Sequence, residues 1–455
     1  MDFLDNLVIP ATTQHLNLLK IILVMSMLIF IPFFGMIFGG TAFSVIFNAY
    51  GRKNKKPLFI RFAKDIIDKL AINRFVGVGL GVIPLLAITF CYAQLMFEVK
   101  VISVSLLFVA TLFMALAVNF VYSFQNTFQI ELLIETFKDI TGLKKHELET
   151  KIPEDIADYE FDLKNTNSNS GLYAFILLLL TAVFFAGGTS IALFSDNYEY
   201  FQNIAQMFLS GATFLNFLFI LVLSITVTGS AILFFFFHWQ GGIQDLDKDK
   251  EYYNFVKKIG GNIAFTGAAL LPIFLFFSFI MIPNVALSGT VFTYTGLAFV
   301  SILILCNFLY AVIKNSDMKY IGAAFYVLIL SIGFTIMKNQ SAFGTASFKH
   351  LQAINIAAEE LHQEKKGKTI STAGVDGEEI YTRVCSACHK FDVKLVGPPY
   401  SQTVPTFNGD VKKLSAWIQN PTKVYPDYPP MPNPGIKPKE ADAVAKYLID
   451  KVGGK

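Results

Sequence analysis

Two cysteines and a histidine lie close together near the C-terminal end of the sequence, in the run Cys385-Ser386-Ala387-Cys388-His389. Two thiols at this spacing reach the two vinyl groups of a porphyrin from one turn of helix. The adjacent imidazole is then held beneath the iron as its axial ligand. The pattern is typical of covalent attachment of a c-type haem. It therefore predicts one covalent haem c and the transfer of one electron at a time.

The composition indicates what surrounds this motif. Of the 455 residues, 54% are hydrophobic and only 16% are charged, so most of the chain belongs in a lipid bilayer. The net charge of +3 is small and concentrated in a few loops, which argues against a nucleic acid partner. Cys91 and Cys306 lie alone in apolar runs, where a small buried side chain is expected. The N-terminus lacks the pattern of a removable signal peptide.

Uncharged runs long enough to cross about 30 Å of hydrocarbon define the membrane spans. The fifth run is longer than one crossing requires, and the eighth is short. The sequence therefore predicts an all-α, polytopic bundle of about eight spans in contact with membrane lipid. The runs lie near residues 21–45, 75–97, 101–125, 171–194, 206–236, 262–282, 289–313 and 320–337.

Lys and Arg collect in alternate loops between these spans. Among the even-numbered loops only Lys100 is basic, so the odd-numbered loops are predicted to be cytoplasmic. With eight spans, both termini then lie on the periplasmic side of a cell inner membrane, where c-type haem is normally attached. The basic residues of the odd loops are Arg52, Lys53, Lys55, Lys56, Arg61, Lys64, Lys69, Arg74, Lys138, Lys144, Lys145, Lys151, Lys164, Lys248, Lys250, Lys257, Lys258, Lys314 and Lys319.

Changes in composition divide the chain into three parts. They are a transmembrane helical domain at 1–340, a periplasmic helix and linker at 341–373, and a haem-binding domain at 374–455. Within the second part, Ala342 to Lys365 is predicted to form a helix on or above the membrane, followed by a polar tether. Inside the third loop, the polar run Asn165 to Gly171 predicts a flexible linker.

Residues 374–455 resemble the class I, mono-haem cytochrome c family over the whole domain. The resemblance rests on more than the haem-attachment motif, and it implies a small all-α haem domain that serves electron transfer. The shared features are a first helix Gly377–Cys385 with Gly377 and Tyr381 at a helix crossing, a last helix Pro438–Val452 carrying Tyr447, and Gly397-Pro398-Pro399 after His389.

This resemblance also implies roles for single residues. The carbonyl of Pro398 would accept the proton of the outer imidazole nitrogen, which fixes the ring and tunes the iron. Met431, the only methionine of this domain, would be the sixth ligand, held by flanking prolines. An iron ligated by His389 and Met431 has no open site for a substrate. Trp417 either directs its indole toward a haem propionate or packs in the core.

Eight spans are more than an anchor needs, so a further haem, haem b, is possible within the membrane. His15 precedes the first span on the outer side, whereas His238 lies at the cytoplasmic end of the fifth span, too far away to share one iron. Met207, Met281 and Met337 lie at the outer ends of their spans and could partner His15. Each is also an ordinary core residue, and His238 is equally an interfacial residue.

Residues 10–95 resemble subunit I of the cytochrome bd oxidase family, in its variant with a fused cytochrome c. The shared features are His15, the basic loop Arg52 to Lys69, and the glycine-spaced run Ile72 to Gly81. The resemblance implies that His15 is an axial ligand of a high-spin haem. Met207 lies near the place of the family's second haem-ligating histidine.

Other family features are missing from this sequence. The third span has no acidic residue, and the loop from Ile282 to Ser288 is too short for a quinol-binding loop. The chain is therefore not expected to oxidise quinol by the usual route, nor to reduce oxygen alone.

Three hypotheses follow. In the first, the chain is an electron-transfer subunit of a membrane respiratory oxidoreductase, passing electrons between periplasmic haem c and membrane haem b, with other subunits and a periplasmic redox partner. In the second, haem c is an electron shuttle on a haem-free multi-span scaffold. The third is a transporter or sensor, which ranks last because the predicted spans contain almost no ionisable residues.

Overall fold

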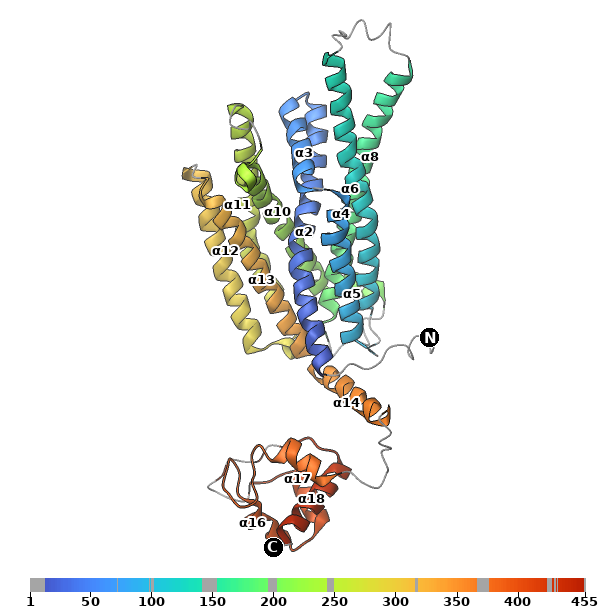
Figure 1. Ribbon diagram of the computed structural model, residues 1–455. Coiled ribbons are helices and arrows are strands. Elements are labelled where there is room, and N and C mark those ends of the chain that lie inside the picture. Colours follow the sequence, from blue (N-terminus) through green and yellow to red (C-terminus); the bar gives the residue numbers. More distant parts are fainter. Residues whose placement is uncertain are drawn as a thin grey trace. The chain divides into compact units, whose positions relative to one another are not determined.

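The computed structural model is all-α, as predicted (Figure 1). It describes residues 13–71, 73–97, 99, 102–140, 154–194, 203–243, 249–315, 318–365, 376–423, 428, 431 and 433–453, among which there is no strand. The chain divides into two compact units, Met1–Ala358 and Glu359–Lys455. Their boundary lies within helix α14 (Phe348–Lys365). The two units are described separately.

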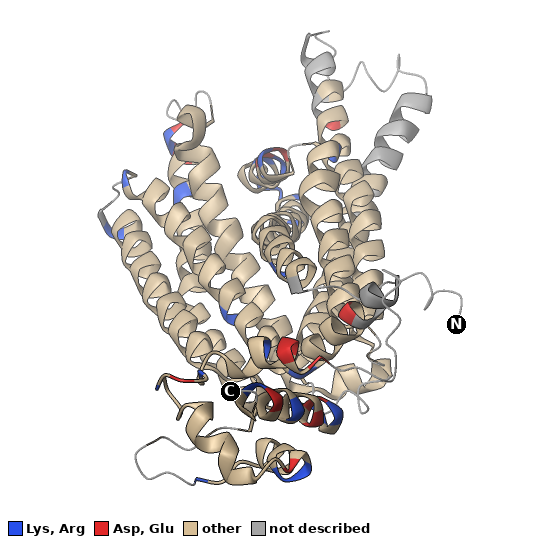
Figure 2. Cartoon of the chain, turned by 60° about the horizontal axis from the view of Figure 1, so that its bottom comes forward, with Lys and Arg blue, Asp and Glu red and all other residues tan. Residues whose placement is uncertain are grey.

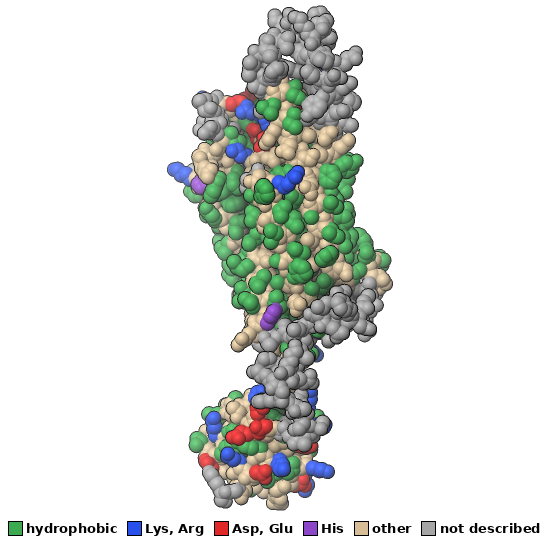
Figure 3. Space-filling view, turned by 45° about the vertical axis from the view of Figure 1, so that its right-hand side comes forward, with side chains coloured by type: hydrophobic (Ala, Val, Ile, Leu, Met, Phe, Trp, Pro, Cys, Tyr) green, Lys and Arg blue, Asp and Glu red, His purple; other side chains and the backbone are tan. Residues whose placement is uncertain are grey.

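Among the described residues of the membrane unit, eight helices are long and apolar enough to span a bilayer, which confirms the predicted number. Figure 2 shows that Lys, Arg, Asp and Glu are sparse along these helices and gather toward their ends. Hydrophobic side chains cover much of the face seen in Figure 3, as expected for a surface in contact with lipid. The spans are α2 (Thr13–Lys53), α4–η1–α5 (Arg74–Gly77, Val78–Val82, Ile83–Leu95), α6 (Ser103–Ile140), α8 (Glu154–Ile191), α10 (Gly211–Phe237), α11 (Lys250–Ile280), α12 (Gly289–Asn315) and α13 (Tyr320–Ala346).

Most of the observed helices are longer than the uncharged runs that predicted them, whereas the fifth run is divided. The fifth run begins with a separate short helix, α9 (Ile204–Leu209), and α10 starts after Ser210, whose hydroxyl accepts a hydrogen bond from the Thr213 amide. The eighth span continues to Ala346, beyond its predicted end at residue 337. The longer helix brings Lys338 into the span, where it is fully buried.

The polar run from Asn165 to Gly171 is helical, so the prediction of a flexible linker here was wrong. It lies inside α8, where the Asn167 side chain has partners on neighbouring helices. Asn167 donates to the Thr127 hydroxyl at 2.6 Å and accepts from the Asn48 amide at 2.9 Å. Buried polar side chains that are matched in this way stabilise a helix that their composition alone would not favour.

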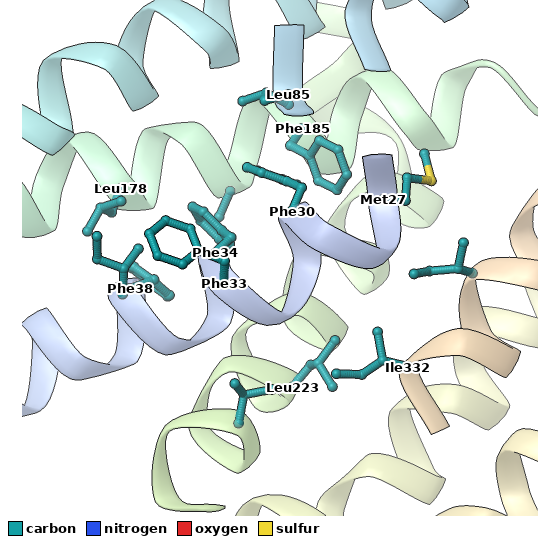
Figure 4. Packing of buried hydrophobic residues seen from close by; sticks show 14 of the residues in the cluster. Met27, Phe30, Phe33, Phe34, Phe38, Leu85, Leu178, Phe185, Leu223 and Ile332 are labelled. Carbon is teal, nitrogen blue, oxygen red and sulfur yellow. The ribbon is translucent and has the colours of Figure 1, made fainter. Parts of the chain in front are cut away.

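The core of the membrane unit is built around phenylalanines of α2. Phe30, Phe34 and Phe38 form a ladder of ring contacts along this helix, and Phe185 of α8 contacts Phe30 at 5.1 Å between ring centroids (Figure 4). Helix α10 packs against α11 so closely at Gly229 that a Cβ there would lie 2.3 Å from the backbone nitrogen of Ala264. Glycine is therefore required at this crossing.

An amphipathic helix, α3 (Pro57–Leu70), lies in the basic loop after the first span. Its apolar residues Phe62, Ile66 and Leu70 are buried against residues of α10 and α11. On the same helix, the carboxylate of Asp65 accepts a hydrogen bond of 2.6 Å from the Tyr252 hydroxyl. Burial raises the pKa of Asp65, although the Tyr252 bond and the nearby Arg61 act in the opposite direction.

The second unit is a small helical domain. Gly377 crosses α18 (Pro438–Gly453) so closely that a Cβ would lie 2.3 Å from the Ala443 carbonyl oxygen and 2.5 Å from Cβ of Tyr447. Only glycine fits such a crossing without displacing backbone. The rings of Tyr381 and Tyr447 meet beside it, at 5.8 Å between centroids. The elements are α15 (Gly377–Ile380), η6 (Tyr381–Cys385), α16 (Tyr400–Thr403), η7 (Val404–Phe407), α17 (Val411–Gln419) and α18 (Pro438–Gly453).

Candidate haem site

A cavity that opens to solvent lies within the second unit. Its walls are mostly apolar, which is typical of a site for a large hydrophobic ligand. All six residues of this domain that the sequence singled out contribute to the lining. They are Cys385, Cys388, His389, Pro398, Trp417 and Met431.

The two cysteines are brought together by one turn of backbone. Helix η6 ends at Cys385, and the amides of Cys388 and His389 donate to the Cys385 carbonyl at 3.1 and 3.0 Å. The Cys385 side chain is buried and that of Cys388 is exposed. Burial raises the pKa of the Cys385 thiol. Both sulfur-bearing side chains line the cavity, as attachment of one porphyrin requires.

The orientation of the His389 imidazole is fixed by the backbone of Gly397 and Pro398. Its Nδ1 atom lies 2.9 Å from the Pro398 carbonyl oxygen. A carbonyl only accepts, so Nδ1 carries the proton and donates, which leaves the Nε2 lone pair available to a metal. Gly397 permits this approach, because a Cβ at that position would lie 2.1 Å from the His389 ring. The Tyr400 ring packs against the imidazole at 5.0 Å between centroids.

Trp417 and Met431 complete the lining. The Nε1 atom of Trp417 is buried and has no hydrogen-bond partner among the described residues. Such a donor is costly to bury unless a ligand supplies an acceptor. Met431 is half-buried, and the prolines 429, 430 and 432 around it lie outside the described residues. The cavity, the free imidazole nitrogen and the unmatched indole N–H together fit a haem with acidic side chains.

Sequence reasoning missed three aromatic residues of this cavity, Tyr400, Phe407 and Tyr428. Tyr400 is buried beside both Cys385 and His389, and burial raises its pKa above the ordinary value. Tyr428 also lines the cavity, and the ammonium of Lys394 lies 4.7 Å from its ring centroid. Tyr400 directly follows Gly397-Pro398-Pro399, and Pro398 was predicted to contact His389. This position was the one signal in the sequence that could have placed Tyr400 at the cavity.

The candidate ligands of the membrane unit have different surroundings. His15 is exposed near the start of α2, whereas Met207 is fully buried with Leu106 and Ile191. The sulfur of Met207 packs so closely on Gly187 that a Cβ there would lie 2.3 Å away. At the opposite end, His238 packs on Gly322 and lies 5.4 Å from the Phe234 ring. His15 and Met207 line neither the cavity at His389 nor a second cavity, which lies within the membrane unit.

Comparisons with known proteins agree with the geometry of the second unit. The family model described as cytochrome c matches residues 374–450. Cytochrome c-551 of Pseudomonas denitrificans is 32% identical over 77 residues, which are 16% of this chain and 94% of that protein. No solved structure matches the chain.

Proposed function

The chain belongs to the cytochrome c family through its second unit, and from this premise we propose that it transfers electrons at a membrane between haem c and a haem within the bundle. Membership of the family implies a covalently bound haem c. Such a haem, when bound, supplies a one-electron couple at its iron. The observation that carries the proposal is the convergence of Cys385, Cys388, His389 and Met431 on one cavity.

The residues of the cavity have separate tasks in this proposal. The thiols of Cys385 and Cys388 would attach the porphyrin through thioether bonds, and Nε2 of His389 would ligate the iron. Pro398 holds the imidazole by accepting from Nδ1, which raises the electron density on Nε2. Met431 would also ligate the iron, so that the site would handle electrons and exclude substrates. The buried indole N–H of Trp417 would donate to a propionate.

The membrane unit is proposed to continue the electron path. Residues 10–95 resemble subunit I of cytochrome bd oxidases, and eight spans are far more than one haem domain needs as an anchor. In this proposal His15 ligates a haem b, with Met207 as a candidate second ligand. The chain would act as a bd-like subunit that does not reduce oxygen alone, together with other subunits of a respiratory complex and a periplasmic redox partner. Both termini would be periplasmic and the spans would lie in the inner membrane.

A second function is favoured by one observation in the membrane unit. Met207 is enclosed by apolar side chains and Gly187, and His15 is exposed, so neither lies in a formed cavity. On this evidence the alternative is a haem c shuttle carried by a scaffold without haem.

Electron transfer kinetics distinguish the two functions. The complex is placed in vesicles and reduced with a reagent that cannot cross the membrane, while haem c and haem b absorbance are followed separately. The proposal predicts reduction of haem c followed by a slower haem b phase, and loss of that phase in His15→Ala. Unchanged haem content and unchanged kinetics in His15→Ala would favour the scaffold.

A further inference from the structure

Helix α12 lies at the edge of the membrane unit, where it packs mainly against α11 and α13 (Figure 1). In its most apolar stretch 33% of the residues are buried, compared with 78% in α10. Ala298, Leu305 and Leu309 of α12 belong to the core, so one side of the helix is fixed within the bundle. The other side is exposed along the whole length of the helix.

The exposed side of α12 contains a row of residues in which spacings of four and three positions alternate. This is the spacing of a helix that packs along a single parallel partner. The two glycines of the row have no atom near the place that a Cβ would take, so another backbone can come close to them. The row consists of Gly289, Thr293, Gly296, Val300, Leu303, Asn307 and Tyr310.

Asn307 is a carboxamide in the middle of this apolar surface. Its side chain is exposed and forms no hydrogen bond with the described residues. It precedes Lys314, at the charged end of the helix, by seven positions. At about 1.5 Å per residue, this places it about 10 Å below that end, within the hydrocarbon. Lipid provides no hydrogen bond to a carboxamide there, so its exposure costs free energy.

Other asparagines of the membrane unit have partners within the chain. Asn167 accepts a hydrogen bond from the Asn48 amide at 2.9 Å. Asn119 is exposed on α6, as Asn307 is on α12, but its amide donates to the Ala115 carbonyl of its own helix at 3.1 Å. Asn307 has no such bond among the described residues. Its donor and its acceptor are therefore both available to a partner beside α12.

We propose that the exposed side of α12 packs against the same side of a second copy of this chain, with the two Asn307 side chains hydrogen-bonded to each other. Copies of one chain enter the membrane in the same orientation, so a twofold axis between them runs along the membrane normal. The two α12 helices are then parallel, and each residue near the axis meets its own copy. A carboxamide both donates and accepts, so Asn307 is complementary to itself.

The other residues of the row fit the same contact. In parallel helix pairs a single polar residue among apolar ones fixes the register, and Asn307 has this place between Leu303 and Tyr310. Lys314 lies beyond the row at the aqueous end, where salt screens its charge from that of its copy. Its ammonium lies 5.3 Å from the ring centroid of Tyr310 on its own helix. A helix of another protein would instead need a polar residue of its own at the depth of Asn307.

The association of the purified complex in lipid vesicles tests the proposal. Each chain carries one fluorophore, and counting bleaching steps at several protein-to-lipid ratios gives the fraction of paired chains. Wild type is expected to pair. Asn307→Leu keeps the approximate size and removes the carboxamide, so its dissociation constant should rise about tenfold. Asn119→Leu, at an equally lipid-facing position of α6, is the matched control and should pair as wild type does.

Photo-cross-linking identifies what covers the helix in native membranes. Leu303→Cys is prepared in a chain in which Cys91 and Cys306 are replaced with alanine, and the new thiol is labelled with a benzophenone maleimide. Irradiation is expected to link two copies of the chain. Leu116→Cys on α6 is the control, because Leu116 is 51% exposed and Leu303 is 52% exposed. It should give no link between copies.

Several results would overturn the proposal. Wild-type chains that stay single at every protein-to-lipid ratio, or that pair no more tightly than Asn307→Leu, would do so. A link from Leu303→Cys to a different protein, or to lipid alone, would also overturn it by assigning the surface to another occupant. If Asn307→Leu does not accumulate, Gly296→Leu replaces it, because a leucine at this open position would hold the two helices apart. Pairing of Gly296→Leu as tight as that of wild type would then contradict the contact.

Discussion

His389 of the second unit and Lys338 of the membrane unit differ in how their buried polar groups are satisfied. At His389, the Pro398 carbonyl matches Nδ1 and leaves one nitrogen free to bind a metal. At Lys338, the Ser278 hydroxyl is the one hydrogen-bond partner of the ammonium among the described residues, and the side chain is completely buried. His389 lines a cavity, whereas Lys338 is not among the residues that line the cavity of the membrane unit.

Buried polar groups can indicate the kind of ligand that binds beside them in two ways. A free lone pair held in fixed geometry indicates a metal ligand, whereas an excess of donors indicates an anion. Trp417 belongs to the second kind, because its buried N–H has no acceptor among the described residues. The cavity at His389 is thus expected to contact an acidic group of its ligand.

The largest effect is expected at the attachment cysteines. Replacing Cys385 and Cys388 together with alanine removes both sulfurs that bond the porphyrin, so the covalent haem stain of the denatured chain should be lost completely. The double variant Cys91→Ala with Cys306→Ala is the control and should stain like wild type. Staining that persists without Cys385 and Cys388 would defeat the assignment of the cavity.

The next largest effect is expected at the sixth ligand. Met431→Ala should retain the covalent haem, but the reduction potential should fall by part of the roughly 0.8 V range that axial ligands control. Redox titration and the visible spectrum measure this change. Met281→Ala, which removes a methionine from the membrane cavity, should leave the haem c potential unchanged. If Met431→Ala has the spectrum and potential of wild type, the sixth ligand is another residue.

A smaller effect is expected at Trp417. Trp417→Phe keeps an aromatic ring in the cavity and removes the unmatched N–H. If this N–H donates to a haem propionate, the loaded domain should lose about 1.5–3 kcal/mol of stability, as for a hydrogen bond to a charged group. Denaturant unfolding of the haem-loaded protein measures this loss in the free energy of unfolding. Equal or greater stability of the variant would show that the ring only packs in the core.

The smallest effect concerns Asp65, a partly buried carboxyl group with partners within the chain. Its pKa is raised from the ordinary value of 3.8 by burial, so the folded state holds the proton more tightly than the unfolded state. The resulting stability is present below pH 3.8 and is lost as the pH rises through the folded pKa. Asp65→Asn should remove this pH dependence, which thermal unfolding at several pH values would detect. An identical pH profile for Asp65→Asn and wild type would contradict the raised pKa.

Local patterns in the sequence predicted the second unit well. The attachment motif was recognised from its spacing, whereas the roles of Pro398 and Trp417 followed from the resemblance to class I cytochromes c, with Trp417 left between a propionate contact and core packing. The same resemblance assigned Gly377 to a helix crossing, and the structure places Ala443 and Tyr447 against it. Tyr400 was missed because an aromatic residue by itself does not distinguish a core from a cavity.

The sequence predicted the number of spans in the membrane unit, but it did not predict the contacts between their buried polar side chains. Hydropathy located eight spans, yet it ended the last one at residue 337 because Lys338 follows. The structure extends α13 to Ala346 and pairs Lys338 with Ser278, which lies 60 positions earlier in the chain. Similarly, Asn167 appeared to belong to a linker because its partners, Asn48 and Thr127, are distant in sequence. Contacts of this kind depend on how helices pack, which single-helix patterns do not determine.

The haem content of the purified complex tests the central claim most directly. A pyridine haemochrome spectrum, read against protein concentration, gives the amounts of haem c and haem b in one measurement. The account predicts one covalent haem c per chain together with haem b. A spectrum with haem c alone would contradict the proposed path of electrons from His389 into the membrane.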